Sequence, residues 1–124
     1  MDLTLRRALP IVVDLVCVIA FAFGGKSAHE SHAGLGTVAA IAWPFVVALA
    51  VGWVAAIWNG MRGLQVWPGG VLILATTYAL GMLLREVEGR GFAVGFLIVA
   101  ACFLALTMLG WRALWALWRR RGAR

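Results

Sequence analysis

Four long runs of apolar residues, separated by short polar segments, make up most of the chain. They cover approximately residues 8–25, 35–59, 68–84 and 92–114. Each run approaches the roughly 20 residues that an α-helix needs to cross a hydrocarbon layer about 30 Å thick. The segments between the runs are too short to fold separately. The pattern therefore predicts an all-α polytopic membrane protein, with four transmembrane helices that form one bundle and a single domain over residues 1–124.

The composition supports a lipid environment for these helices. Of the 124 residues, 64% are hydrophobic and 13% are charged, whereas soluble domains contain about 45–50% apolar and about 25% charged residues. A chain of this length cannot bury so much apolar surface in a core of its own. The formal charge of +6 would suggest a nucleic-acid partner for a soluble protein. Here the basic residues lie at the ends of the apolar runs, so we expect membrane lipids as partners and no nucleic acid.

The distribution of basic residues predicts which helix ends face the cytoplasm, because Lys and Arg are enriched on that side of membrane proteins. If both termini are cytoplasmic, the cytoplasmic side carries far more basic residues than the outer side. The cytoplasmic set is then Arg6, Arg7, Arg62, Arg112, Arg119, Arg120, Arg121 and Arg124, and the outer set is Lys26, Arg85 and Arg90. This asymmetry predicts a multi-pass protein of the plasma membrane with both termini in the cytoplasm.

Two stretches of the chain resemble each other. Gly52-Trp53-Val54-Ala55-Ala56-Ile57-Trp58 is similar to Gly110-Trp111-Arg112-Ala113-Leu114-Trp115, with one residue deleted. Two copies of one helical hairpin in the same orientation would explain the similarity. Chance similarity between helices rich in Ala and Trp explains it equally well, so the sequence leaves the repeat open.

Asp14 is the most informative residue, because it interrupts the first apolar run within one or two turns of its cytoplasmic end. A carboxylate at that depth costs roughly 3 kcal/mol unless it is paired, hydrated or protonated. One interpretation is a carboxylate that binds a proton or a cation and faces the interior of the bundle. The other is a structural carboxylate that pairs with Arg112, which the topology places on the same side. The sequence leaves both interpretations open.

Three further polar positions are candidates for binding a substrate or an ion. Arg85 ends the third run and would meet an anionic substrate from outside, although a solvated helix end is the simpler interpretation. His29, near Glu30 and His32, suggests a vestibule that titrates near neutral pH, or simply a solvated loop. Two histidines and one glutamate are a weak signal for a metal, so we expect neither a metal nor another cofactor. Thr77 lies on the polar face of the third helix, where hydroxyls usually bond backbone carbonyls or a neighbouring helix.

The last helix carries a tail rich in Trp and Arg. Trp111, Trp115 and Trp118 recur at spacings of four and three residues, which puts them on one helical face, and three arginines follow at 119–121. Because Trp favours the headgroup region of a membrane, the tail predicts an interfacial belt. A surface for binding a partner protein is the alternative.

Several short motifs together span nearly the whole chain. They are Asp14 early in the first run, Gly24 with His29 beyond it, Trp43-Pro44-Phe45, Arg85, and Gly110-Trp111-Arg112. This set resembles the bacterial four-helix integral membrane proteins of domain of unknown function family 3054, which are common in actinobacteria. The resemblance implies a protein of the bacterial inner membrane, and it assigns no activity to any residue. Lys26 stands where many relatives have Arg.

Three functions are compatible with these features. The leading hypothesis is a small transporter or channel for an ion or a small solute, with Asp14 as its binding carboxylate; four helices enclose little volume, so we expect a homo-oligomer. The alternative is a non-transporting accessory subunit or lipid-binding module, for which the C-terminal tail would meet lipid or a membrane protein partner. A membrane enzyme is the weakest hypothesis, because no second acid or nucleophile is evident near Asp14. Redox chemistry would also need Cys17 and Cys102 to come together.

Overall fold

The computed structural model describes residues 3–29, 35–61, 65–89 and 94–122. Every regular element in these ranges is helical, which confirms the predicted all-α class. The elements are α1 (Leu3–His29), α2 (Leu35–Trp58), the short π-helical segment η1 (Val66–Gly70), α3 (Val71–Val87), α4 (Val94–Leu104), a second π-helical segment η2 (Ala105–Leu109) and α5 (Gly110–Gly122). Because α4, η2 and α5 follow one another without a break, they form one continuous helix of 29 residues.

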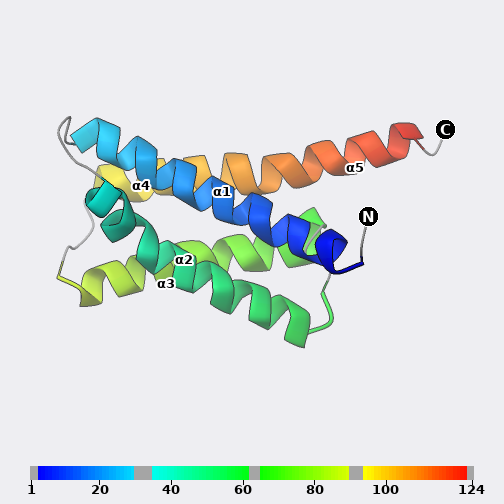
Figure 1. The fold of residues 1–124 in the computed structure, drawn as a ribbon, viewed down its shortest axis with the longest axis horizontal. Coiled ribbons are helices and arrows are strands. Elements are labelled where there is room, and N and C mark those ends of the chain that lie inside the picture. The colour runs from blue at the N-terminus through cyan, green and yellow to red at the C-terminus, as the bar shows by residue number, and fades with distance from the viewer. Residues whose placement is uncertain (1–2, 30–34, 62–64, 90–93, 123–124) are drawn as a thin grey trace.

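The four long helices lie side by side in an elongated bundle (Figure 1). The N- and C-termini lie at the same end, which is also the end at which α2 finishes and η1 begins. The end of α1 and the starts of α2 and α4 lie at the opposite end. We call these the terminal end and the distal end of the bundle. The helix α5 continues past the other helices at the terminal end.

Within the part of the chain that the structure describes, three helices are long and apolar enough to cross a membrane: Val38–Trp58, Val66–Val87 and Val94–Gly122. The apolar part of α1, Ala8–Gly24, is shorter than these three spans. The first and the last helix of the chain extend beyond their predicted apolar runs, since α1 begins at Leu3 and α5 reaches Gly122. Arg and Leu, which are frequent in these extensions, are good helix formers.

Two glycines allow α2 and α3 to pack closely along their length. A Cβ atom at Gly52 of α2 would lie 3.2 Å from both the Ile73 carbonyl oxygen and the Thr76 Cβ of α3. A Cβ atom at Gly81 of α3 would collide with the Phe45 ring of α2. Small residues of this kind are typical of helix pairs in lipid, where close backbone approach replaces the hydrophobic effect as a source of attraction.

Aromatic side chains fill the distal end of the bundle. The Phe21 ring of α1 meets the Phe45 ring of α2 edge-on at 5.2 Å between centroids, and the Phe96 ring of α4 lies 5.6 Å from Phe21. The Tyr78 hydroxyl donates a 3.0 Å hydrogen bond to the Leu97 carbonyl and so links α3 to α4. We call Phe21, Phe45 and Phe96 the aromatic cluster.

The outward faces of the helices are apolar as well. Val54 and Ile57 of α2 are 62% and 63% exposed, and Leu106 of η2 is 77% exposed. A helix that is apolar on all sides requires apolar surroundings on all sides. This feature distinguishes the chain from a soluble bundle, whose outer faces are polar.

Candidate functional site

Asp14 lies in the interior of the bundle, on the face of α1 that meets the other helices. Its side chain has no exposed surface. The surrounding core is apolar and includes Val18 of α1 and Met108 of η2, both completely buried. A carboxylate in such surroundings must be paired or hydrogen-bonded, because removing an isolated charge from water costs far more than a folded protein can supply.

Arg112 of α5 provides the opposite charge. Its Nη1 atom lies 2.8 Å from Oδ1 of Asp14 and its Nη2 atom lies 2.5 Å from Oδ2, so the guanidinium and the carboxylate meet edge to edge. Arg112, like Asp14, has no exposed surface. This two-pronged geometry is the strongest that Arg and a carboxylate form. The sequence left open whether the two residues touch, and the structure brings them together.

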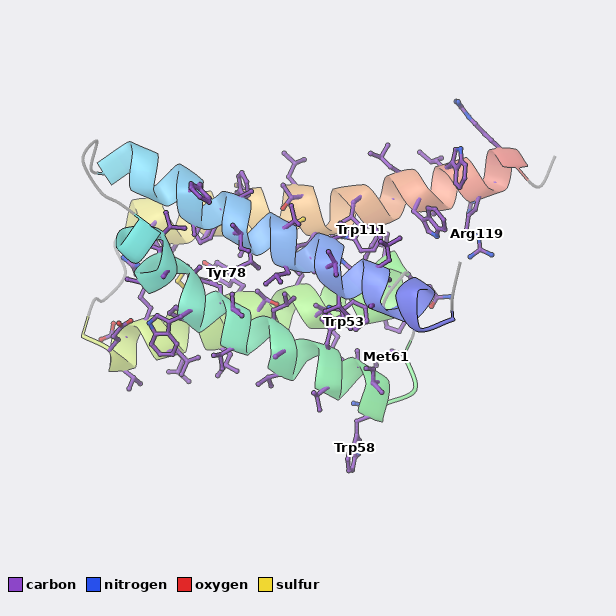
Figure 2. All side chains as sticks on the ribbon, viewed as in Figure 1. Trp53, Trp58, Met61, Tyr78, Trp111 and Arg119 are labelled. Carbon is purple, nitrogen blue, oxygen red and sulfur yellow. The ribbon has the colours of Figure 1, made fainter. Side chains whose placement is uncertain are left out.

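Two tryptophans complete the hydrogen bonding of the carboxylate. The indole Nε1 of Trp53, on α2, donates to Oδ2 of Asp14 at 2.9 Å, and that of Trp111, on α5, donates to Oδ1 at 2.8 Å. In the view of Figure 2, Trp53 and Trp111 lie on opposite sides of the α1 ribbon. Each carboxylate oxygen therefore accepts one bond from Arg112 and one from an indole. We call Asp14, Arg112, Trp53 and Trp111 the carboxylate site.

Arg112 is also held by contacts that do not involve Asp14. Nη1 donates to the Met108 carbonyl at 2.9 Å, and the guanidinium carbon lies 4.5 Å from the centre of the Trp111 ring. The side chain passes over Gly70, where an added Cβ atom would lie 2.7 Å from Cδ of Arg112. Only a residue without a side chain leaves room for the arginine at this position.

The two π-helical segments shape the walls of the site. In η1 the Gly70 amide donates to the Gln65 carbonyl at 2.8 Å, and Trp67 has extended backbone angles. This turn places Gly70 against Arg112. In η2, one turn before Arg112, the Thr107 hydroxyl donates to the Phe103 carbonyl at 2.8 Å. Because Trp67 is not helical, η1 is a kink at the start of α3. Only η2 is a π-turn within a continuous helix, a feature that is rare and occurs frequently at functional sites.

The arrangement is a closed, electrically neutral unit. The carboxylate has two oxygens with about four acceptor positions, and the four N–H groups described above occupy them. The site joins α1 to α2 and to the C-terminal helix. It can therefore hold these helices together, and a change in the charge of Asp14 would break the ion pair that joins them.

The structure separates the other candidate residues from this site. Arg85 lies in the last turn of α3, at the distal end, where its guanidinium stacks on the Phe96 ring at 4.0 Å. Gly70, which contacts Arg112, precedes the first turn of α3, so Arg85 lies about 20 Å from the carboxylate site along the helix axis. Thr77 is buried and donates to the Ile73 carbonyl of its own helix at 2.7 Å.

His29 is the last residue of α1 and so belongs to the distal end, about 20 Å from Asp14 along the helix. Its side chain lies outside the described part of the structure, as do Glu30 and His32, so the predicted vestibule stays a prediction. The two thiols, Cys17 and Cys102, are both free.

Sequence reasoning missed both tryptophans of the site. Trp111 was expected in the interfacial belt, but its indole turns inward to Asp14. Trp115 and Trp118, with ring centroids 5.3 Å apart, are the residues of that face that stay exposed. A signal was present, since Trp53 and Trp111 occupy matching places in the two similar Gly-Trp stretches. The Gly-Trp pair that the two stretches share provides both indole donors, whether the similarity reflects an internal repeat or chance.

Comparison with known proteins identifies the family. The family described as "Protein of unknown function (DUF3054)" matches residues 11–115. The chain belongs to this family. The match confirms the resemblance and includes all four residues of the carboxylate site. No curated protein and no solved structure matches the chain.

Proposed function

We propose that the chain is an integral membrane protein of the bacterial inner membrane, that it crosses the membrane four times, and that both termini are cytoplasmic. Three helices of sufficient length and the apolar outer surface support the membrane location. The shared position of the two termini at one end of the bundle supports an even number of crossings (Figure 1). The excess of arginine at that end supports its cytoplasmic orientation.

We further infer that the protein is a small transporter or channel for an ion or a small solute. The buried pair of Asp14 and Arg112 is the observation that carries this proposal. Ionisable groups within the apolar part of membrane helices are costly, and they commonly mark ion or substrate pathways. A buried ion pair is also a poor means of stabilisation, because apolar residues of similar volume are often as stable or more stable.

The pair suggests how such a pathway would open. Asp14 lies on α1 and Arg112 lies on the continuous C-terminal helix, so the pair holds two helices together only while the carboxylate is charged. Protonation of Asp14 or arrival of a competing ion would release α1. Four helices enclose little interior volume, and the outer faces of this bundle are apolar. We therefore expect a homo-oligomer, in which neighbouring protomers contribute to the pathway.

The test is ion flux into proteoliposomes that contain the purified protein, under an imposed pH gradient and membrane potential. Wild type is compared with Asp14→Asn, which keeps the shape of the side chain and removes its charge. Glu88→Gln is the matched control, because Glu88 is an exposed carboxylate at the distal end that accepts a 3.2 Å bond from Trp43. We expect flux in wild type and in Glu88→Gln, and its loss in Asp14→Asn. Equal flux in all three would refute the role of Asp14.

A second candidate function is a non-transporting accessory subunit or lipid-binding module. Two observations favour it. The acceptor positions of the Asp14 carboxylate are filled, and α5 extends beyond the bundle with Trp118 and Arg119–Arg121 exposed. Figure 2 shows Arg119 on the part of α5 that runs past the other helices. If this function is correct, wild type shows no flux, and the chain is recovered from native membranes with a protein partner or with tightly bound anionic lipid.

A further inference from the structure

The N–H groups around Asp14 have the form of a receptor for a planar anion. Two come from the edge of the Arg112 guanidinium, and one each from the indoles of Trp53 and Trp111, at distances of 2.5–2.9 Å from the carboxylate oxygens. Together they surround a flat group with two oxygens on one edge. A monatomic ion such as chloride can satisfy few of these donors at once. A tetrahedral oxyanion can present two oxygens to Arg112, but it carries further oxygens that these four donors do not reach.

The donors are held in place independently of the carboxylate. Arg112 is fixed by its bond to the Met108 carbonyl, by the Trp111 ring and by the space over Gly70. Trp53 belongs to the buried core of the bundle and is 7% exposed. If the carboxylate left, Arg112 would keep these contacts and Trp53 would keep its packing in the core. A receptor that is already organised loses little free energy when it binds a ligand.

The occupant comes from a different helix than the donors do. Asp14 is carried by α1, whereas the donors are carried by α2 and by the C-terminal helix. Of the four long helices, α1 has the shortest apolar stretch. A displacement of α1 would therefore vacate the receptor without dismantling it.

We propose that the receptor binds a small planar oxyanion with the two-oxygen edge of a carboxylate, and that Asp14 is an internal competitor that occupies the receptor in this structure. The proposal deepens the transport function proposed above and rests on it for its biological role. In the exchange, Asp14 takes up one proton from solution, becomes a neutral acid and moves away from Arg112. The anion then takes its place beside the guanidinium.

Charge balance favours this exchange within a membrane. Before it, the site holds one negative carboxylate and one positive guanidinium; after it, the site holds a neutral acid, an anion and the same guanidinium. The net charge is zero in both states, so no uncompensated charge is buried. Among the described side chains, Arg112 pairs with Asp14, and the Cys17 thiol of α1 interacts with it electrostatically. The described residues of α2, η1 and η2 include no titratable side chain, and the Tyr78 hydroxyl of α3 donates to the Leu97 carbonyl instead. The expected transport is therefore the electroneutral movement of one anion with one proton.

The test replaces the occupant by an external one. Asp14→Ala keeps the Cβ atom and removes one carboxylate, so formate supplies the missing group, while acetate carries a methyl group that has no room beside the alanine. Asp14→Gly also removes the Cβ atom, so acetate fits this variant. We expect formate to raise the thermal midpoint of Asp14→Ala by several degrees in detergent, and acetate to do so for Asp14→Gly. A ligand at one hundred times its Kd raises the ratio of folded to unfolded protein about 100-fold.

Three controls make the result specific. Sodium chloride and sodium sulfate at equal ionic strength measure the general effect of salt. Wild type, whose receptor is occupied, should respond to formate no more than to chloride. The double variant Asp14→Ala with Arg112→Met lacks the guanidinium and should lose the response to formate. Equal shifts of the thermal midpoint of Asp14→Ala by formate and by chloride would overturn the proposal. The proposal would also be overturned if neither Asp14→Ala with formate nor Asp14→Gly with acetate folds.

A second arm separates the receptor from the transport function. Uptake of labelled formate is measured in wild-type proteoliposomes, with and without an inward proton gradient and with the membrane potential clamped at zero. Saturable uptake that the proton gradient accelerates supports both proposals. Rescue of Asp14→Ala by formate without any uptake by wild type supports the receptor and refutes transport. Proton flux that depends on Asp14, with no rescue by formate, supports transport and overturns the receptor.

Discussion

At the terminal end of the bundle the helices are joined by hydrogen bonds to one carboxylate, whereas at the distal end they are joined by aromatic rings. The carboxylate site has four donors within 3 Å of two oxygens. The aromatic cluster has ring centroids 5.2–6.3 Å apart, with the Arg85 guanidinium over its edge. Both arrangements link three helices, and both include an arginine that stacks on an aromatic ring.

The difference lies in how each arrangement responds when one member is lost. A ring in an apolar cluster contributes dispersion and buried area, which the remaining side chains partly recover by moving. Removal of one residue of the carboxylate site leaves a buried charge or an unsatisfied hydrogen-bond donor in place, and no neighbouring group can supply the missing partner. The aromatic cluster is therefore suited to holding helices permanently, and the carboxylate site is suited to a contact that is either fully made or broken.

The largest expected effect comes from removing one charge of the buried pair. Asp14→Leu or Arg112→Met should each lower the free energy of unfolding by about 3–5 kcal/mol, because the remaining charge stays buried without its partner. The double variant should recover most of this loss, since two apolar side chains replace a neutral pair. Reversible unfolding in mixed detergent micelles, arranged as a double-mutant cycle, measures the coupling. Additive losses would show that the two charges do not interact in the folded protein.

A smaller effect is expected when the space for the arginine is filled. Gly70→Ala places a Cβ atom 2.7 Å from Cδ of Arg112 and 2.7 Å from the Gln65 carbonyl oxygen. The displacement should cost about 1–3 kcal/mol, a value typical of overpacked sites. Gly110→Ala is the control, because a Cβ atom there meets nothing within 4 Å. That variant should be as stable as wild type or slightly more stable, since alanine favours the helix; an equal cost for both variants would contradict the proposed fit of Arg112 over Gly70.

The smallest effect is expected at the distal end. Phe96→Leu keeps an apolar side chain in the aromatic cluster and removes the ring beneath Arg85, whose stacking contributes about 0.5–1 kcal/mol. We expect a total loss of about 1 kcal/mol in the same unfolding assay, and no change in ion flux. Ile98→Leu, at an exposed position of α4, should leave stability unchanged. A loss as large as that of Asp14→Leu would remove the contrast between the two ends.

Hydrophobic patterning was sufficient to predict the helices. The apolar runs identified every long helix, and Asp14 was recognised as a functional candidate because a carboxylate is so improbable in such a run. The ends of the helices were predicted less well. Arg119–Arg121 were treated as a tail, yet they continue α5 to Gly122, since a helix without tertiary contacts depends on propensity rather than on apolar pattern.

The geometry of the carboxylate site was beyond prediction from local patterns. Topology placed Asp14 and Arg112 at the same end but could not show that they face each other. Trp111 was assigned to the membrane interface, because helical periodicity groups it with Trp115 and Trp118. The three residues do share one face of α5, but α5 runs past the other helices at the terminal end (Figure 1), so Trp111 meets the bundle whereas Trp115 and Trp118 are exposed. The fit of Arg112 over Gly70 joins residues far apart in the chain, and no feature of either segment alone indicates it.

If the protein crosses the membrane as proposed, the continuous helix from Val94 to Gly122 also sets the depth of the carboxylate site. Its 29 residues span about 43 Å, which exceeds a hydrocarbon layer of about 30 Å by several residues. On the proposed orientation, with Val94 at the outer boundary, the hydrocarbon ends near Leu114. Arg112 then lies in the last turn inside the hydrocarbon, and Arg119–Arg121 lie in cytoplasmic water. A proton from the cytoplasm would have to travel about one helical turn to reach Asp14, whereas one from outside would have to cross nearly the whole membrane, so the two faces of the membrane have unequal access to the same carboxylate.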